Sequence, residues 1–80
     1  MTALLEQLGE RIRELRDARG LSQEALAAAA DISREYVSDI EHGRYKVTVA
    51  VLVRVARALG TEGWAILQHA ERNAERKVRK

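Results

Sequence analysis

Cationic side chains are the clearest candidates for a chemical role in this sequence, and they are unevenly distributed along it. The 80 residues include 14 Lys and Arg and 12 Asp and Glu, which gives a formal net charge of +2. Residues 43–60 hold four cations and no acid, whereas residues 21–42 hold five acids and one Arg. Basic segments can neutralise the phosphates of a nucleic acid. For charge runs alone, a solvated surface is an equally good interpretation.

Other reactive residue types are few. The sequence has no Cys and only two His, His42 and His69, so we expect neither disulfides nor a metal site. Ser22 or Ser33 together with His42 lacks an orienting acid at the spacing that nucleophilic catalysis needs. A chain of this length buries one small core and leaves no room for a large substrate cavity. We therefore expect a protein that is not an enzyme, with no cofactor and no small-molecule ligand.

The elements that must position the charged residues are predicted to be helices, which makes the fold class all-α. The sequence has no Pro, and its apolar residues recur at steps of three and four. Ser22, Ser33 and Thr48 stand where N-caps would, and Thr61 could cap a last helix. These signals predict helices over 4–19, 23–30, 34–42, 49–59 and 62–75. We expect one domain over 1–70, followed by a basic, solvated and frayed helix end over 71–80.

One segment carries a competing signal. Valines alternate with other residues from Val47 to Val55, and this period of two is typical of a strand. No second segment of this kind exists to pair with it, and a lone strand would leave its backbone polar groups unsatisfied. The helix over 49–59 is therefore the preferred interpretation.

The second and third helices form the most informative pair. They are short and are joined by Asp31, Ile32 and Ser33, a turn that forces two helices to cross steeply. This pattern over 23–42 is typical of a helix-turn-helix, and a generic helical hairpin is the alternative. Val37 and Ile40 would face the core. The outward face of the third helix is then made of Arg34, Glu35, Ser38, Asp39 and His42.

The residues LGERIRELRDARGLSQEALAAAADISREYVSDIEHG (8–43) and VLVRVARALG (51–60) resemble the lambda-repressor-like (Xre/Cro-type) helix-turn-helix regulators. The resemblance covers roughly residues 5–68 and implies a compact five-helix DNA-binding domain that controls transcription, usually as a dimer. The REYVSDIE and RYKVT segments and the length also resemble the controller proteins of restriction–modification systems. Two departures from the family pattern are Asp31, where a Gly is usual, and a loop after Gly43 without Pro.

The resemblance implies a role for individual residues, because in this family the third helix enters the major groove. The residues expected to read bases are Arg34, Glu35, Ser38 and Asp39. The residues expected to bind phosphates are Gln23, Tyr36, Arg44, Tyr45 and Lys46. Arg34 could bind guanine through two hydrogen bonds, whereas Glu35 could simply favour the helix N-terminus. Arg16 and Glu41 match a structural ion pair of the family.

Apolar residues that the core does not need predict a homodimer. Its interface is expected to include Val51, Val55, Trp64 and Leu67, although Trp64 could instead close the core of one protomer. Two recognition helices about 34 Å apart would read a near-palindromic operator. No apolar run reaches the length of about 20 residues that a membrane helix needs. We expect a cytoplasmic, nucleoid-associated protein of bacterial or phage type that binds double-stranded DNA. A protein-binding module, antitoxin-like or adaptor, is the alternative that the acids of 21–42 favour.

Overall fold

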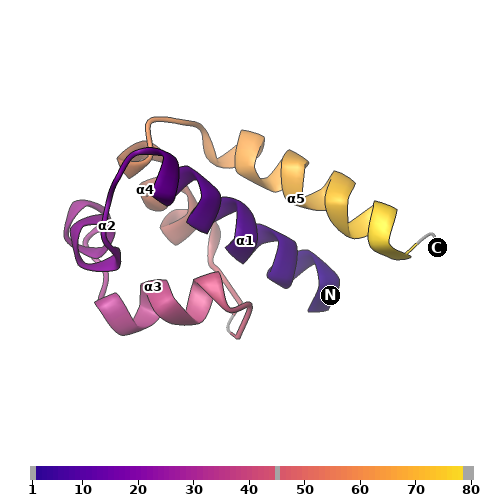
Figure 1. Cartoon of the computed structure of the whole chain (residues 1–80), viewed down its shortest axis with the longest axis horizontal. Helices are drawn as coiled ribbons and strands as arrows, with labels where there is room; N and C mark the ends of the chain where they lie inside the picture. The colour runs from indigo at the N-terminus through magenta and orange to yellow at the C-terminus, as the bar shows by residue number, and fades with distance from the viewer. Residues whose placement is uncertain (1, 45, 79–80) are drawn as a thin grey trace.

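The computed structural model describes residues 2–44 and 46–78, and the described residues form five helices with no strand. The helices are α1 (Thr2–Ala18), α2 (Gln23–Ala30), α3 (Arg34–Glu41), α4 (Val49–Ala58) and α5 (Gly63–Val78) (Figure 1). The all-α, five-helix prediction is confirmed. The alternating valines of 47–55 lie mainly in α4, where Val51 and Val55 are four residues apart and both face the core.

Three of the five helices begin at the hydroxyl residues that the sequence indicates. The Ser22 side chain accepts a hydrogen bond from the Ala25 N–H at 3.0 Å, and Ser33 accepts one from Tyr36 at 3.0 Å. Thr48 accepts one from the Val51 N–H at 3.1 Å. Each bond satisfies a backbone donor that the first helical turn leaves free. At α5 the predicted cap is wrong. The helix begins at Gly63, and the residue that precedes it is Glu62, not Thr61.

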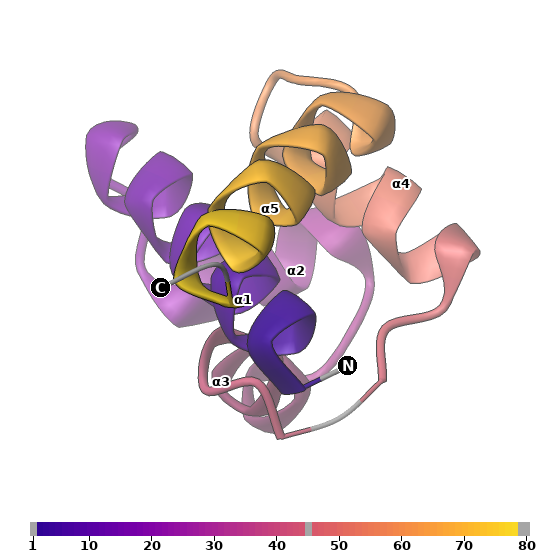
Figure 2. The same ribbon diagram turned by 90° about the vertical axis from the view of Figure 1, so that its right-hand side faces the viewer.

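α1 is the central helix of the arrangement. It lies between α5 on one side and α3 on the other in both views (Figures 1 and 2). α2 packs against α3 and α4, and α4 packs against α5. The fully buried large side chains come from all five helices: Ile12, Leu26, Val37, Ile40, Val55 and Ile66. One core therefore fixes α3 relative to the rest of the molecule.

The contact between α1 and α3 depends on a glycine. A Cβ at Gly9 would lie 2.3 Å from the carbonyl oxygen of Ile40 and 2.7 Å from that of Glu41. Both oxygens belong to the backbone at the end of α3, so they cannot move aside as a flexible side chain would. Gly9 thus lets α1 lie directly against the last turn of α3.

α5 continues beyond the end predicted for it. The helix runs without a break from Gly63 to Val78, and both Ala70 and Ala74 are buried. Residues 71–78 continue this helix, with Ala74 buried and Glu71, Arg72, Glu75 and Arg76 exposed. The frayed, solvated end expected over 71–80 stays a prediction. The prediction for residues 79 and 80 lies outside the described residues.

Candidate nucleic-acid interface

The turn between α2 and α3 is built around a left-handed aspartate. Asp31 has φ 58° and ψ 49°, and it is the one described residue other than Gly with a positive φ. The N–H of the next residue, Ile32, donates to the Ala27 carbonyl at 3.0 Å, which closes the end of α2. Asp tolerates this conformation better than most residues. The chain therefore turns sharply here without glycine, and α3 starts two residues later at its Ser33 cap.

α3 divides its residues between the core and the surface as predicted from the sequence. Val37, Ile40 and Glu41 are buried. Arg34 and Glu35, in the first turn, are exposed, while Tyr36, Ser38 and Asp39 are half-buried. The ring Nδ1 of the exposed His42 lies 2.7 Å from the Ser38 carbonyl, at hydrogen-bond distance. A hydrogen bond from Arg34 to Gln23 joins the first turn of α3 to the start of α2 in one polar surface.

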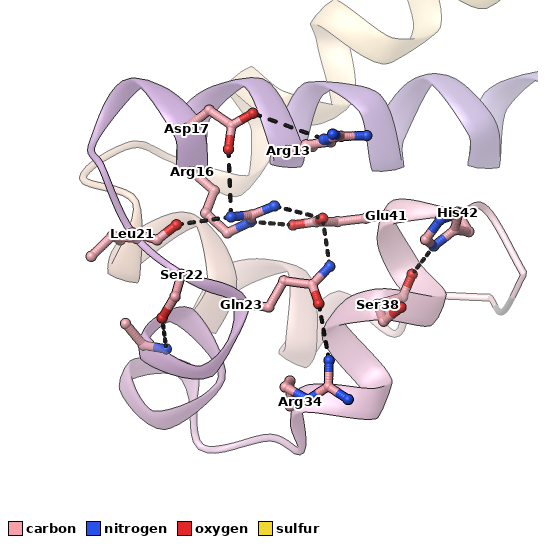
Figure 3. A network of polar contacts seen from close by, with 11 residues as sticks. Arg13, Arg16, Asp17, Leu21, Ser22, Gln23, Arg34, Ser38, Glu41 and His42 are labelled. Carbon is pink, nitrogen blue, oxygen red and sulfur yellow. Dashed lines mark hydrogen bonds and ion pairs between the residues drawn. The ribbon is translucent and has the colours of Figure 1, made fainter.

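Behind this surface, Arg16 of α1 and Glu41 of α3 form an ion pair with two hydrogen bonds (Figure 3). Arg16 Nε donates to Glu41 Oε2 at 2.6 Å, and Arg16 Nη2 donates to Oε1 at 3.1 Å. Arg16 Nη1 also donates to the Leu21 carbonyl at 2.8 Å. The side chains are only 12% and 3% exposed. The hydrogen bond with Glu41 raises the pKa of Arg16 against the opposing effect of burial, so the guanidinium stays charged throughout the physiological range.

Gln23 connects this ion pair to the exposed surface. Its Nε2 donates to Glu41 Oε1 at 3.0 Å, and its Oε1 lies 3.4 Å from Arg34 Nη1, which donates to it (Figure 3). The four side chains Arg16, Glu41, Gln23 and Arg34 therefore form a continuous polar chain, which we call the polar relay. Nothing in the sequence indicates the links from Gln23 to Arg34 and Glu41, because the residues are 11 and 18 positions apart.

Of the remaining predicted phosphate ligands, Tyr36 lies in the first turn of α3, and Arg44 and Lys46 follow the end of this helix. Arg44 is exposed and pairs with Asp39, Nη1 to Oδ1 at 3.3 Å. Lys46 is exposed. Tyr36 is half-buried and packs against the core. The prediction for Tyr45 lies outside the described residues.

The predicted dimer residues fall into two groups. Val51 and Val55 are buried in the core of the protomer, so their assignment to an intermolecular surface is wrong. Trp64 is 67% exposed and does not close the core. It lines a groove between α4 and α5 together with Leu67 and three residues that sequence reasoning missed, Val49, Leu52 and Val53. We call these five residues the α4–α5 apolar surface. Both faces of α4 are apolar, and only packing distinguishes the buried one.

The described residues contain no group of three or more His, Cys, Asp or Glu side chains that could hold a metal ion. None of the helices in the described ranges is long and apolar enough to cross a membrane.

A short capped helix, a tight turn and a second helix with an exposed first turn define a helix-turn-helix DNA-binding fold. The helix-turn-helix family matches residues 12–63, more than half of the chain. This protein belongs to the helix-turn-helix family of DNA-binding transcriptional regulators. Its relatives and its fold are those of regulators and not of enzymes.

Individual relatives agree with this assignment. The chain is 46% identical over 55 residues to the HTH-type transcriptional regulator RamB of Mycobacterium tuberculosis, covering 69% of this chain and 12% of RamB. It is 43% identical over 60 residues to the immunity repressor of Bacillus phage phi105, covering 75% of this chain and 42% of the repressor. The chain thus spans less than half of either relative. The restriction–modification controller protein C.AhdI of Aeromonas hydrophila has a similar structure, with a TM-score of 0.76 and 40% identity. That similarity covers 78% of this chain and 94% of C.AhdI.

Proposed function

We propose that this protein is a sequence-specific regulator of transcription that acts in the cytoplasm, on nucleoid DNA. In this proposal it binds a near-palindromic operator as a homodimer, with α3 in the major groove. The observation that carries it is the contact between Arg34 and Gln23. This contact joins the first turn of α3 to the first turn of α2, so that one surface offers both a base-reading cation and a helix N-terminus. A helix N-terminus favours an anion such as a phosphate.

The residues proposed to bind DNA suit different parts of it. The guanidinium of Arg34 fits the O6 and N7 acceptors of guanine, and the carboxylates of Glu35 and Asp39 can accept from the N4 amino group of cytosine. Ser38 can donate or accept. Gln23, Arg44 and Lys46 suit backbone phosphates, as do the hydroxyls of Tyr36 and Tyr45. Gln23 uses one N–H for Glu41 and retains a second for a phosphate oxygen.

Arg34 and Lys46 provide the sharpest test of this proposal, because both are exposed cations with different assigned targets. Arg34→Ala should weaken cognate binding by about 1–3 kcal/mol and relax the preference at one base position in each half-site. Lys46→Ala should weaken binding to all sequences alike and reduce the salt slope by about one per protomer. The measurement is a binding titration at several salt concentrations, on a duplex selected from a random pool and on its single-base variants.

Each variant serves as the control for the other. An Arg34→Ala variant that keeps its base preference would show that α3 does not read the operator through this residue. If neither substitution changes DNA binding, the alternative of a protein-binding module replaces the proposal. The acids of 21–42 favour that alternative, but Glu41 and Asp39 are each paired with an arginine, which lowers the net negative charge of the surface.

The homodimer is proposed to form through the α4–α5 apolar surface. Val49 is 79% exposed and lies with Leu52 and Leu67 in a second apolar groove, which Leu4, Leu5 and Val47 of the chain also line. The two grooves adjoin, because they share Val49, Leu52 and Leu67. Contiguous exposed apolar surface of this kind marks an interaction site, and a domain of this size gains stability by covering it.

Trp64→Ala is expected to shift the protein from dimer to monomer, raising the dimer dissociation constant by at least tenfold. A large exposed aromatic residue at the centre of an interface typically carries much of the binding energy. Sedimentation equilibrium at micromolar concentration measures the change, with Gln68→Ala, an exposed polar position on the same helix, as the control. A wild-type protein that sediments as a monomer in this range would contradict the proposed dimer.

A further inference from the structure

Asp39 and Arg44 form an ion pair on the surface that is proposed to face DNA. Arg44 Nη1 lies 3.3 Å from Asp39 Oδ1, and the side chains are 62% and 24% exposed. Among the described residues this is the one ion pair that joins the exposed part of α3 to the segment that follows it. An acid that a phosphate backbone repels and a cation that it attracts are thus held together.

The end of α3 imposes this proximity. Gly43 adopts the left-handed conformation, with φ 68°, and its N–H donates to the Ile40 carbonyl at 3.0 Å. The Arg44 N–H then donates to the carbonyl of Asp39 itself at 2.9 Å. These two bonds form the helix-ending motif in which the chain folds back over the last turn. The backbone therefore brings Arg44 to Asp39, and the side-chain pair adds to a contact that already exists.

An exposed ion pair is weak enough to be exchanged. Pairs of this kind change an equilibrium by about two- to fivefold. A phosphate oxygen is the stronger partner for Arg44 only under one condition. The departure of Arg44 must not leave Asp39 as an unpaired negative charge beside the DNA. A base that donates a hydrogen bond to Asp39 removes that cost, and cytosine N4 and adenine N6 are the donors that the major groove presents.

We propose that Asp39 is a specificity-determining residue that withholds Arg44 from the phosphate backbone until a base amino group engages the Asp39 carboxylate. On non-specific DNA the pair stays closed and Arg44 contributes no phosphate contact. On the operator, the amino group of a cytosine or adenine donates a hydrogen bond to the Asp39 carboxylate, and Arg44 moves to a phosphate of the DNA backbone. This inference rests on the proposed function, since it requires α3 to lie in the major groove.

Glu24 supplies a matched control. It is an exposed acid in the first turn of α2, no ion pair of the described residues includes it, and it has no assigned contact with DNA. Glu24→Gln removes the same unit of charge as Asp39→Asn but releases no cation. The comparison therefore separates release of Arg44 from general repulsion between acids and DNA.

The experiment measures binding of the full chain to a duplex without the selected site, over a series of salt concentrations. Asp39→Asn should tighten this non-specific binding by about two- to fivefold. It should also steepen the salt slope by about 0.9 per protomer, because one more cation reaches a phosphate. Glu24→Gln should leave the slope unchanged. The double variant Asp39→Asn with Arg44→Ala should lose both the gain and the steeper slope.

A second arm uses a duplex selected from a random pool with the wild-type protein. Asp39→Asn should lower the ratio of selected to non-specific affinity by about fivefold or more. It should also change the base preference at one position in each half-site, because an amide pairs with adenine N6 and N7 whereas the carboxylate only accepts. The proposal is overturned if Asp39→Asn and Glu24→Gln change the slope alike, or if the gain in affinity persists without Arg44. Where Arg34→Ala also leaves binding unchanged, the fault lies in the proposed function; where Arg34→Ala relaxes specificity, the fault lies in the Asp39–Arg44 mechanism alone.

Discussion

Glu41→Gln and Arg16→Met are each expected to lower the free energy of unfolding by about 3–5 kcal/mol, because either one leaves a buried charge without its partner. Glu41 accepts hydrogen bonds from two Arg16 nitrogens and from Gln23, so its loss also frees the residue that contacts Arg34. A small domain has a total stability of about 5–15 kcal/mol. The loss is therefore a large fraction of the whole.

Thermal melts at one fixed protein concentration measure this effect, with an expected decrease in Tm of more than about 10 °C. The control is Glu14→Gln, which disrupts the exposed pair between Arg11 and Glu14 and should cost no more than about 1 kcal/mol. Replacing both partners, as Arg16→Met with Glu41→Leu, should restore part of the loss because no unpaired charge remains. Equal melting of Glu41→Gln and Glu14→Gln would contradict the burial of the pair.

Gly9→Ala is expected to destabilise the protein, although helix propensity alone predicts the reverse. Alanine favours a helix interior over glycine by about 1 kcal/mol. The new methyl group would lie 2.3 Å from the carbonyl oxygen of Ile40, far inside van der Waals contact, and backbone on both sides prevents simple relaxation. Overpacking of this kind costs about 1–3 kcal/mol, and we expect it to outweigh the gain in propensity.

Gly63→Ala is the matched control for Gly9→Ala. A Cβ at Gly63 would meet side-chain carbons of Val53 and Leu52 at 3.5 and 3.6 Å, which is ordinary contact. This change should be neutral or stabilising by about 0.4–1 kcal/mol. Urea denaturation of both variants at equal protein concentration gives the comparison. If Gly9→Ala is as stable as Gly63→Ala, α1 and α3 do not approach each other as closely as described.

The sequence predicted the features that local chemistry determines. Ser22, Ser33 and Thr48 identify three helix starts, because a hydroxyl before a helix satisfies a donor only a few residues away. The exposed face of α3 follows from the spacing of Val37 and Ile40 in the same local way. These signals need no knowledge of the rest of the chain, and they were sufficient to place the helix-turn-helix.

Features that depend on packing between distant segments could not be predicted in this way. The residue pattern does not show that Val51 and Val55 are buried, because both faces of α4 are apolar. Which face is buried depends on where α2 and α5 lie. The bridge from Gln23 to Glu41 depends on the position of α2 against α3. The pair between Asp39 and Arg44 depends on the left-handed conformation of Gly43. A residue pattern does not show where that turn directs the side chains.

The polar relay has a consequence for the entropy of association. Fixing a long, flexible side chain at an interface costs about 0.5–1.5 kcal/mol when binding occurs. Arg34 is already held by Gln23, whose amide is oriented by Glu41, and Glu41 is in turn held by the buried Arg16. Part of the rotational freedom of Arg34 is therefore lost when the protein folds, and less of it remains to be lost in the proposed complex with DNA.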